Sequence, residues 1–120
     1  MNAILDTNIL IDYLKAIPQG LIEVDRYSQV SISLITWMEI MAGAKPADLQ
    51  ATRNALLTFS CLPISQQIAE RAFVIRRNRR LKLPDAIILA TAQAAGVLLV
   101  TRNTRDFNAS DPQIRIPYKI

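Results

Sequence analysis

The chain has 120 residues, 51% of them hydrophobic, and no apolar run of membrane-spanning length, so we expect one cytoplasmic domain over residues 1–120. Its single cysteine and its lack of histidine exclude a disulfide framework, zinc sites built on these residues, and the histidine-dependent serine and cysteine triads. The net charge of +4 is local, because five of the fourteen basic residues lie between residues 76 and 82 and the other nine nearly balance the ten acidic residues.

The hydrophobic pattern predicts strands that alternate with helices. In chain order we predict a strand at 2–5, helices at 9–15 and 21–27, a strand at 30–34, helices at 37–44 and 47–59, a strand at 61–62, helices at 66–80 and 85–95, and strands at 97–100 and 114–116. Such alternation is typical of a parallel sheet covered on both faces. We therefore expect a three-layer α/β/α sandwich with a central, mostly parallel five-stranded sheet.

Polar and small residues mark the expected helix ends. Ser65 is expected to cap the helix that follows it, and Gly96 to end the helix that precedes the fourth strand. Thr36 and Glu39 have the spacing of a capping box at the start of the third helix. Cys61 lies in an apolar setting and is expected to be a buried thiol.

Four acidic side chains stand where predicted strands give way to helices or loops. Asp6 follows the first strand directly, and Glu39 lies in the first turn of the helix after the second strand. Asp85 opens a helix too apolar to lie on the surface, and Asp106 follows the fourth strand. In a parallel sheet all four project from the same edge. The other acidic residues are expected to be solvated: Asp12, Glu23, Asp25, Asp48, Glu70 and Asp111.

Clustered carboxylates repel one another unless a cation lies between them. Mg²⁺ or Mn²⁺ takes oxygen ligands, and such an ion can orient a phosphate and generate hydroxide for in-line displacement without histidine. Thr7 and Asn8 add a hydroxyl and an amide at the start of the first helix. Helix capping, the helix dipole or a turn would account for each acid singly, but not for four acids at one sheet edge.

The concentrated basic stretch suggests a partner with a phosphate backbone. A solvated helix face is the alternative, but the stretch runs directly into Leu83-Pro84-Asp85. Arg102 and Arg105 flank the loop that carries Asp106, and both are expected to bind nucleic acid together with the basic stretch. The residues of the basic stretch are Arg76, Arg77, Arg79, Arg80 and Lys82.

As an ordered set, these segments resemble the PIN-domain nucleases, in particular the VapC-type toxins of bacterial and archaeal toxin–antitoxin pairs. The matching stretches are Ile4 to Asp12, Ser33 to Gly43, Leu83 to Ala92 and Leu99 to Phe107. The resemblance implies a Mg²⁺- or Mn²⁺-dependent endoribonuclease with a five-stranded parallel sheet. It also implies a homodimer and a partner antitoxin whose C-terminal segment covers the active site, where an antitoxin arginine would displace the metal.

The resemblance further implies roles for individual residues. Asp6 and Asp85 would be the principal metal ligands, and Glu39 a further acidic ligand or the holder of a metal-bound water. In many relatives the fourth acid stands where this chain has Asn103, and in others where it has Asp106. The polar neighbours of the site would be Thr7, Asn8 and Thr101.

Two other functions stay open at this point. A catalytically weak nucleic-acid-binding or regulatory module on the same fold is favoured by the uncharged Asn103. A phosphatase with Asp6 as its nucleophile would need a second aspartate where this chain has Asn8. Metal-dependent turnover of RNA, compared with turnover of a small phosphate ester, distinguishes these functions from a nuclease.

Overall fold

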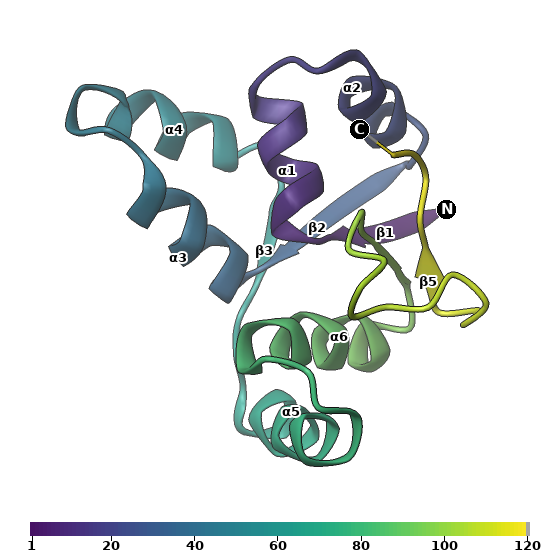
Figure 1. Cartoon of the computed structure of the whole chain (residues 1–120). Helices are drawn as coiled ribbons and strands as arrows, with labels where there is room; N and C mark the ends of the chain where they lie inside the picture. The colour runs from purple at the N-terminus through teal and green to yellow at the C-terminus, as the bar shows by residue number, and fades with distance from the viewer. Residues whose placement is uncertain (120) are drawn as a thin grey trace.

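The fold is built on one five-stranded sheet in a computed structural model that describes residues 1–119 (Figure 1). All four strand pairings are parallel, and the order is β3-β2-β1-β4-β5. The chain builds outward from β1 to β3 and then crosses to β4 on the other side of β1. The order therefore reverses between β1 and β4, which is where open α/β sheets place their ligand sites. The strands are β1 (Asn2–Leu5), β2 (Gln29–Ser33), β3 (Ser60–Leu62), β4 (Leu98–Val100) and β5 (Ile114–Arg115).

Helices cover both faces of the sheet, as predicted for a three-layer sandwich (Figure 1). The helices after β1 and β2 pack on one face, and α5 and α6, between β3 and β4, pack on the other. The helical elements are α1 (Thr7–Leu14), α2 (Pro18–Asp25), α3 (Leu34–Gly43), the 3₁₀ turn η1 (Pro46–Asp48), α4 (Leu49–Leu56), α5 (Gln66–Arg79) and α6 (Leu83–Ala95). No helix within residues 1–119 has the length and apolar character needed to cross a bilayer.

The core follows the alternation of side chains along each strand. Ala3 and Leu5 pack in the apolar cluster that contains Ile9 and Leu10 of α1, whereas Ile4 packs in the cluster of α5 and α6. All three β1 side chains are at most 1% exposed. Because β1 is buried on both faces, the residue that follows it emerges from the middle of the sheet.

The predicted helix ends are partly confirmed. Ser65 Oγ accepts a hydrogen bond from the Ile68 amide at 3.1 Å, and Gly96 ends α6 with φ of +68°. The predicted capping box at Thr36 is wrong: α3 begins at Leu34, and its cap is Ser33. Ser33 is the last residue of β2, so the helix starts with no intervening loop.

Other local expectations were also wrong. The helix predicted over residues 47–59 is the short turn η1 followed by α4, which ends at Leu56. Cys61 is exposed rather than buried, because it lies in β3 at the edge of the sheet. Asp12 and Glu23 are buried, at 2% and 3% exposure, although both were expected to be solvated.

Candidate active site

Asp6 lies at the reversal of the strand order. Its backbone N–H donates to the Val100 carbonyl at 2.8 Å, which joins the ends of β1 and β4. Its side chain caps α1 by accepting from the Thr7 N–H at 2.7 Å, and Thr101 donates its hydroxyl to Asp6 Oδ2 at 2.6 Å. With 4% exposure, this carboxylate is held rigidly at the carboxyl edge of the sheet.

Burial raises the pKa of Asp6 above its usual 3.8, and hydrogen bonds from Thr101 and the Thr7 amide oppose that rise. The negative charge of Glu39 adds to the rise, which indicates that these two carboxylates share one electrostatic environment. The charged form of Asp6 is thus stabilised by hydrogen bonds but carries no cationic partner among these contacts.

Glu39 reaches the same site from α3. Thr7 donates its hydroxyl to Glu39 Oε1 at 2.7 Å, and the hydroxyls of Thr7 and Thr36 lie 3.1 Å apart. Glu39 is exposed, whereas Thr36 is fully buried. The spacing of Thr36 and Glu39 therefore reflects a polar wall of the site, formed with Thr7, rather than a helix cap.

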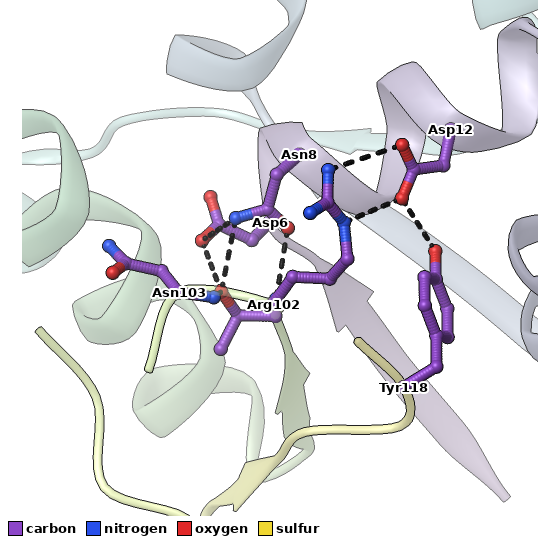
Figure 2. Close-up of polar contacts among 7 residues, drawn as sticks. Asp6, Asn8, Asp12, Arg102, Asn103 and Tyr118 are labelled. Atoms are coloured by element: carbon purple, nitrogen blue, oxygen red, sulfur yellow. Dashed lines mark hydrogen bonds and ion pairs between the residues drawn. The ribbon is translucent and has the colours of Figure 1, made fainter. Parts of the chain in front are cut away.

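Asn8 bridges the two halves of the site. Its Nδ2 donates to Asp6 Oδ2 and to Thr101 Oγ1, both at 3.3 Å, and its Oδ1 accepts from the Arg102 N–H at 3.1 Å. Figure 2 shows Asn8 between Asp6 and the loop that follows β4. The predicted polar neighbours Thr7, Asn8 and Thr101 are thus all in direct contact with the Asp6 carboxylate.

Asp85 stands in the first turn of α6 and is partly buried. Burial, and then the charges of Asp6, Asp106 and Glu39, raise the pKa of Asp85 to about 6, and Lys82 opposes them. Every one of the four predicted carboxylates therefore contributes to one negative field. Such a set of like charges is costly without a cation.

Asn103 and Asp106 are bonded to each other. Asn103 Nδ2 donates to Asp106 Oδ2 at 2.9 Å, and the Asp106 N–H donates to Asn103 Oδ1 at 3.2 Å. The Asn103 N–H also donates to Thr101 Oγ1 at 3.0 Å. Asn103 thus joins Asp106 to the hydroxyl that holds Asp6, so the two candidates for the fourth position act as one unit.

The donor set suits a hard divalent cation in charge and ligand type. Its oxygens come from carboxylates, hydroxyls and amides, which Mg²⁺ and Mn²⁺ prefer. Across residues 1–119 no group of three acidic or thiol side chains is already close enough to hold one ion. Mg²⁺ is commonly held by one or two carboxylates, with water and substrate phosphate as its other ligands, so the site fits such an ion.

The basic stretch lies at the end of α5 and in the link to α6. All of its side chains are exposed, and Arg80 ends α5 in a left-handed conformation with φ of +56°. Lys82 precedes α6 and is close enough to lower the pKa of Asp85. Arg79 lies 3.7 Å from Asp111. The stretch therefore adjoins the carboxylates at the Lys82 end.

Two buried ion pairs were missed by the sequence interpretation. Asp12 is bound by Arg102 and Tyr118, and Glu23 by Arg115 and Tyr27 (Figure 2 for the first). The one local signal was glycine in α2, because a Cβ at residue 20 would lie 3.0 Å from Asp12 Cβ. Close helix packing at that point implies that Asp12 faces inward.

The comparisons with known proteins agree on one family. The model described as PIN domain matches residues 3–111. Ribonuclease VapC10 of Mycobacterium tuberculosis is 26% identical over 125 residues, which cover 98% of this chain and 93% of that protein.

Solved structures agree with this match. A toxin–antitoxin complex from Klebsiella pneumoniae has a chain that is 51% identical with a TM-score of 0.91, and the match covers 98% of this chain and 99% of that one. DNA-bound VapBC from Salmonella typhimurium has a chain that is 28% identical with a TM-score of 0.79, covering 97% and 96%. The similarity therefore extends over essentially the whole chain.

Proposed function

The chain belongs to the PIN domain family, and on that premise we propose that it is a divalent-metal-dependent endoribonuclease and the toxin of a toxin–antitoxin pair. The observation that carries the proposal is a set of four carboxylates at the reversal of the strand order, three of which raise the pKa of the fourth, Asp85. The similarity to Ribonuclease VapC10 and to chains of toxin–antitoxin complexes supports the substrate and the partner.

Asp6 and Asp85 are the residues that would hold Mg²⁺ or Mn²⁺, with Glu39 and Asp106 as further acidic groups. When bound, the cation would neutralise the carboxylates and polarise a phosphodiester group of RNA. Because Thr101 and the Thr7 amide both donate to Asp6, this carboxylate is oriented before any ligand arrives. Such orientation lowers the reorganisation needed for reaction.

The basic stretch would bind the RNA backbone beside these carboxylates. Its exposed guanidinium and ammonium groups can contact successive phosphates and offset the negative field of the site. Arg105, exposed in the loop after β4, would add a contact on the other side of Asp106. This arrangement predicts affinity that depends strongly on salt and only weakly on RNA sequence.

An antitoxin segment would cover the site. A groove of about 310 Å³ lies between α1 and the α3–α4 unit, lined by Ile11, Leu14 and Ile40, with Glu39 and Lys15 among its polar residues. An apolar segment could fill this groove and project an arginine among the carboxylates, where it would replace the cation. A homodimer of the toxin is part of the same proposal.

Cleavage of structured RNA by the partner-free protein tests the proposal. We expect cleavage with Mg²⁺ or Mn²⁺, none with EDTA, and at least a hundredfold loss in Asp6→Asn and Asp85→Asn. Asp48→Asn removes one carboxylate at an exposed position in η1; it is the matched control and should retain activity. RNA binding without cleavage under every metal condition would favour the alternative, a catalytically weak nucleic-acid-binding module.

A further inference from the structure

A buried ion pair lies directly behind the candidate active site. Asp12, on α1, is 2% exposed, and Arg102 donates to it through Nε at 2.7 Å and Nη2 at 3.3 Å. The Tyr118 hydroxyl donates to Asp12 Oδ2 at 2.8 Å. Figure 2 shows the three side chains side by side, with Arg102 between Asp12 and the Asp6–Asn8 pair. The proposed hydrolysis gives none of these three side chains a role at the reacting phosphate.

We propose that Arg102 is a positioning residue: Asp12, itself held by the Tyr118 hydroxyl, binds the guanidinium, and the Arg102 backbone thereby fixes Asn8 and the loop at 101–107 around Asp6. The inference deepens the proposed ribonuclease function and rests on it. It replaces the sequence-based expectation that Arg102 binds nucleic acid.

Arg102 is held at both of its ends. Its side chain is anchored on α1 by Asp12, and its backbone N–H donates to Asn8 Oδ1 at 3.1 Å. Asn8 in turn donates to Asp6 Oδ2. A shift of the Arg102 backbone would therefore reach Asp6 through only two hydrogen bonds. The next residue, Asn103, would carry the same shift to Asp106 through its side chain.

The geometry disfavours Arg102 as a direct RNA ligand. Two of its guanidinium nitrogens face one carboxylate, and this side chain is 29% exposed against 3% for that of Asp12. Withdrawing the guanidinium to reach a phosphate would leave a buried carboxylate without its ion pair, which is unfavourable. Arg105, three residues further along the loop, is exposed. Among the contacts of the described residues 1–119 it makes no ion pair with Asp12, so its guanidinium can reach a phosphate.

The chain contains a matched control with the same chemistry. Arg115 donates to Glu23 through Nε at 2.7 Å and Nη2 at 3.1 Å, and the Tyr27 hydroxyl donates to Glu23 Oε2 at 2.6 Å. This cluster joins α2 to β5 and makes no hydrogen bond to Asp6 or Asn8 in the part of the chain described, residues 1–119. Corresponding substitutions in the two clusters therefore separate positioning from general stability.

The first experiment measures amide hydrogen exchange in the full-length, metal-free protein. Tyr118→Phe and Asp12→Asn should increase exchange of the Arg102 and Asn103 amides by about tenfold or more, the change expected when a local opening becomes easier by roughly 1.4 kcal/mol. Tyr27→Phe and Glu23→Gln should leave the exchange of these two amides within about twofold of wild type, when each protein is measured equally far below its own unfolding midpoint. Unchanged exchange in both Asp12→Asn and Tyr118→Phe overturns the proposal. If Asp12→Asn does not fold, Tyr118→Phe, which keeps the ion pair, decides alone.

The second experiment separates kcat from KM for RNA cleavage. Positioning predicts that Tyr118→Phe and Arg102→Lys lower kcat by about tenfold or more, while KM and its salt dependence stay near wild type. A direct phosphate contact predicts instead that Arg102→Ala raises KM and lowers the salt slope by about one, with unchanged loop exchange. That result overturns the proposal. If the wild type cleaves no RNA at all, the proposed function fails, while hydrogen exchange still decides whether Arg102 positions the loop.

Discussion

Asp85→Asn should stabilise the metal-free protein, although it removes a residue from the proposed site. The pKa of Asp85 is raised from 3.8 to about 6 by burial and by the three neighbouring carboxylates. The folded state therefore holds the proton more tightly than the unfolded state between these two values. Stability must then fall as the pH rises through this window, and the cost is complete above about pH 7.

The size of the effect follows from the same shift. Two pKa units correspond to about 3 kcal/mol for a fully buried group. Because Asp85 is only partly buried, solvent screening reduces this figure, and we expect a gain of about 1 to 2 kcal/mol in Asp85→Asn at pH 7.5. For a domain of this size that corresponds to a rise in Tm of roughly 5 °C. Near pH 4 the two proteins should be equally stable.

Urea unfolding in EDTA, followed by the fluorescence of Trp37, measures this difference. Adding Mg²⁺ should stabilise the wild type more than Asp85→Asn, because ligand binding to the folded state alone raises its stability. Asp48→Asn, at an exposed site in η1, controls for the loss of one charge. Lower stability of Asp85→Asn at pH 7.5, or a gain that is the same at pH 4 and pH 7.5, would refute the electrostatic reasoning.

Three further predictions follow from the charges. Mg²⁺ affinity, measured by calorimetry, should weaken about tenfold from pH 7.5 to pH 5, because Asp85 must lose its proton near pH 6 to bind a cation; equal affinities would contradict this. The double variant Arg76→Glu and Arg77→Glu should weaken RNA binding and lower its salt slope by about one to two, as read from fluorescence anisotropy; an unchanged slope would exclude a phosphate contact at these residues. Burial is the largest single influence on Glu23 and would raise its pKa, but the hydrogen bonds from Arg115 and Tyr27 and the charges of Arg115 and Arg26 together outweigh it, and the pKa is lowered from 4.5. Its stabilisation is thus present above pH 4.5 and lost on acidification, so Glu23→Gln should cost about 3 kcal/mol at pH 7 and less as the pH falls below 4.5, whereas a cost independent of pH would contradict the assignment.

The sequence was sufficient to predict the strand layout and the edge at which the acids meet. Each strand is short, the two central strands β1 and β4 are mainly apolar, and parallel connection then leaves no freedom over which edge Asp6 occupies. Asp85 could be predicted to lie at this edge because the helix that it opens is largely apolar and offers little solvated face to an acid. Both predictions rest on patterns within a few neighbouring residues, and each pattern is compatible with only one placement in the folded sheet.

The buried acids could not be predicted in this way. Asp12 lies among apolar residues of α1, but its partners Arg102 and Tyr118 are 90 and 106 positions away. The spacing of residues along a helix indicates which face is polar. It cannot indicate that a cationic side chain from a distant part of the chain will pair with an acid on the apolar face. The prediction that Cys61 is buried was wrong for the opposite reason: its apolar neighbours in the sequence suggested a core position, but it lies on an edge strand.

The placement of these ion pairs explains how the last part of the site is ordered. Between β4 and β5 only Thr101 and Phe107 are buried, so apolar packing holds this segment at few points. Strand β5 has two residues and lies at the edge of the sheet, where it has one neighbour. Arg102 and Arg115 stand just beyond β4 and within β5, and each is bound to a buried acid of the opposite half of the chain. Ionic anchors therefore hold this segment where hydrophobic burial is sparse, and of the two it is the Arg102–Asp12 pair, next to Asn103, on which the position of Asp106 depends.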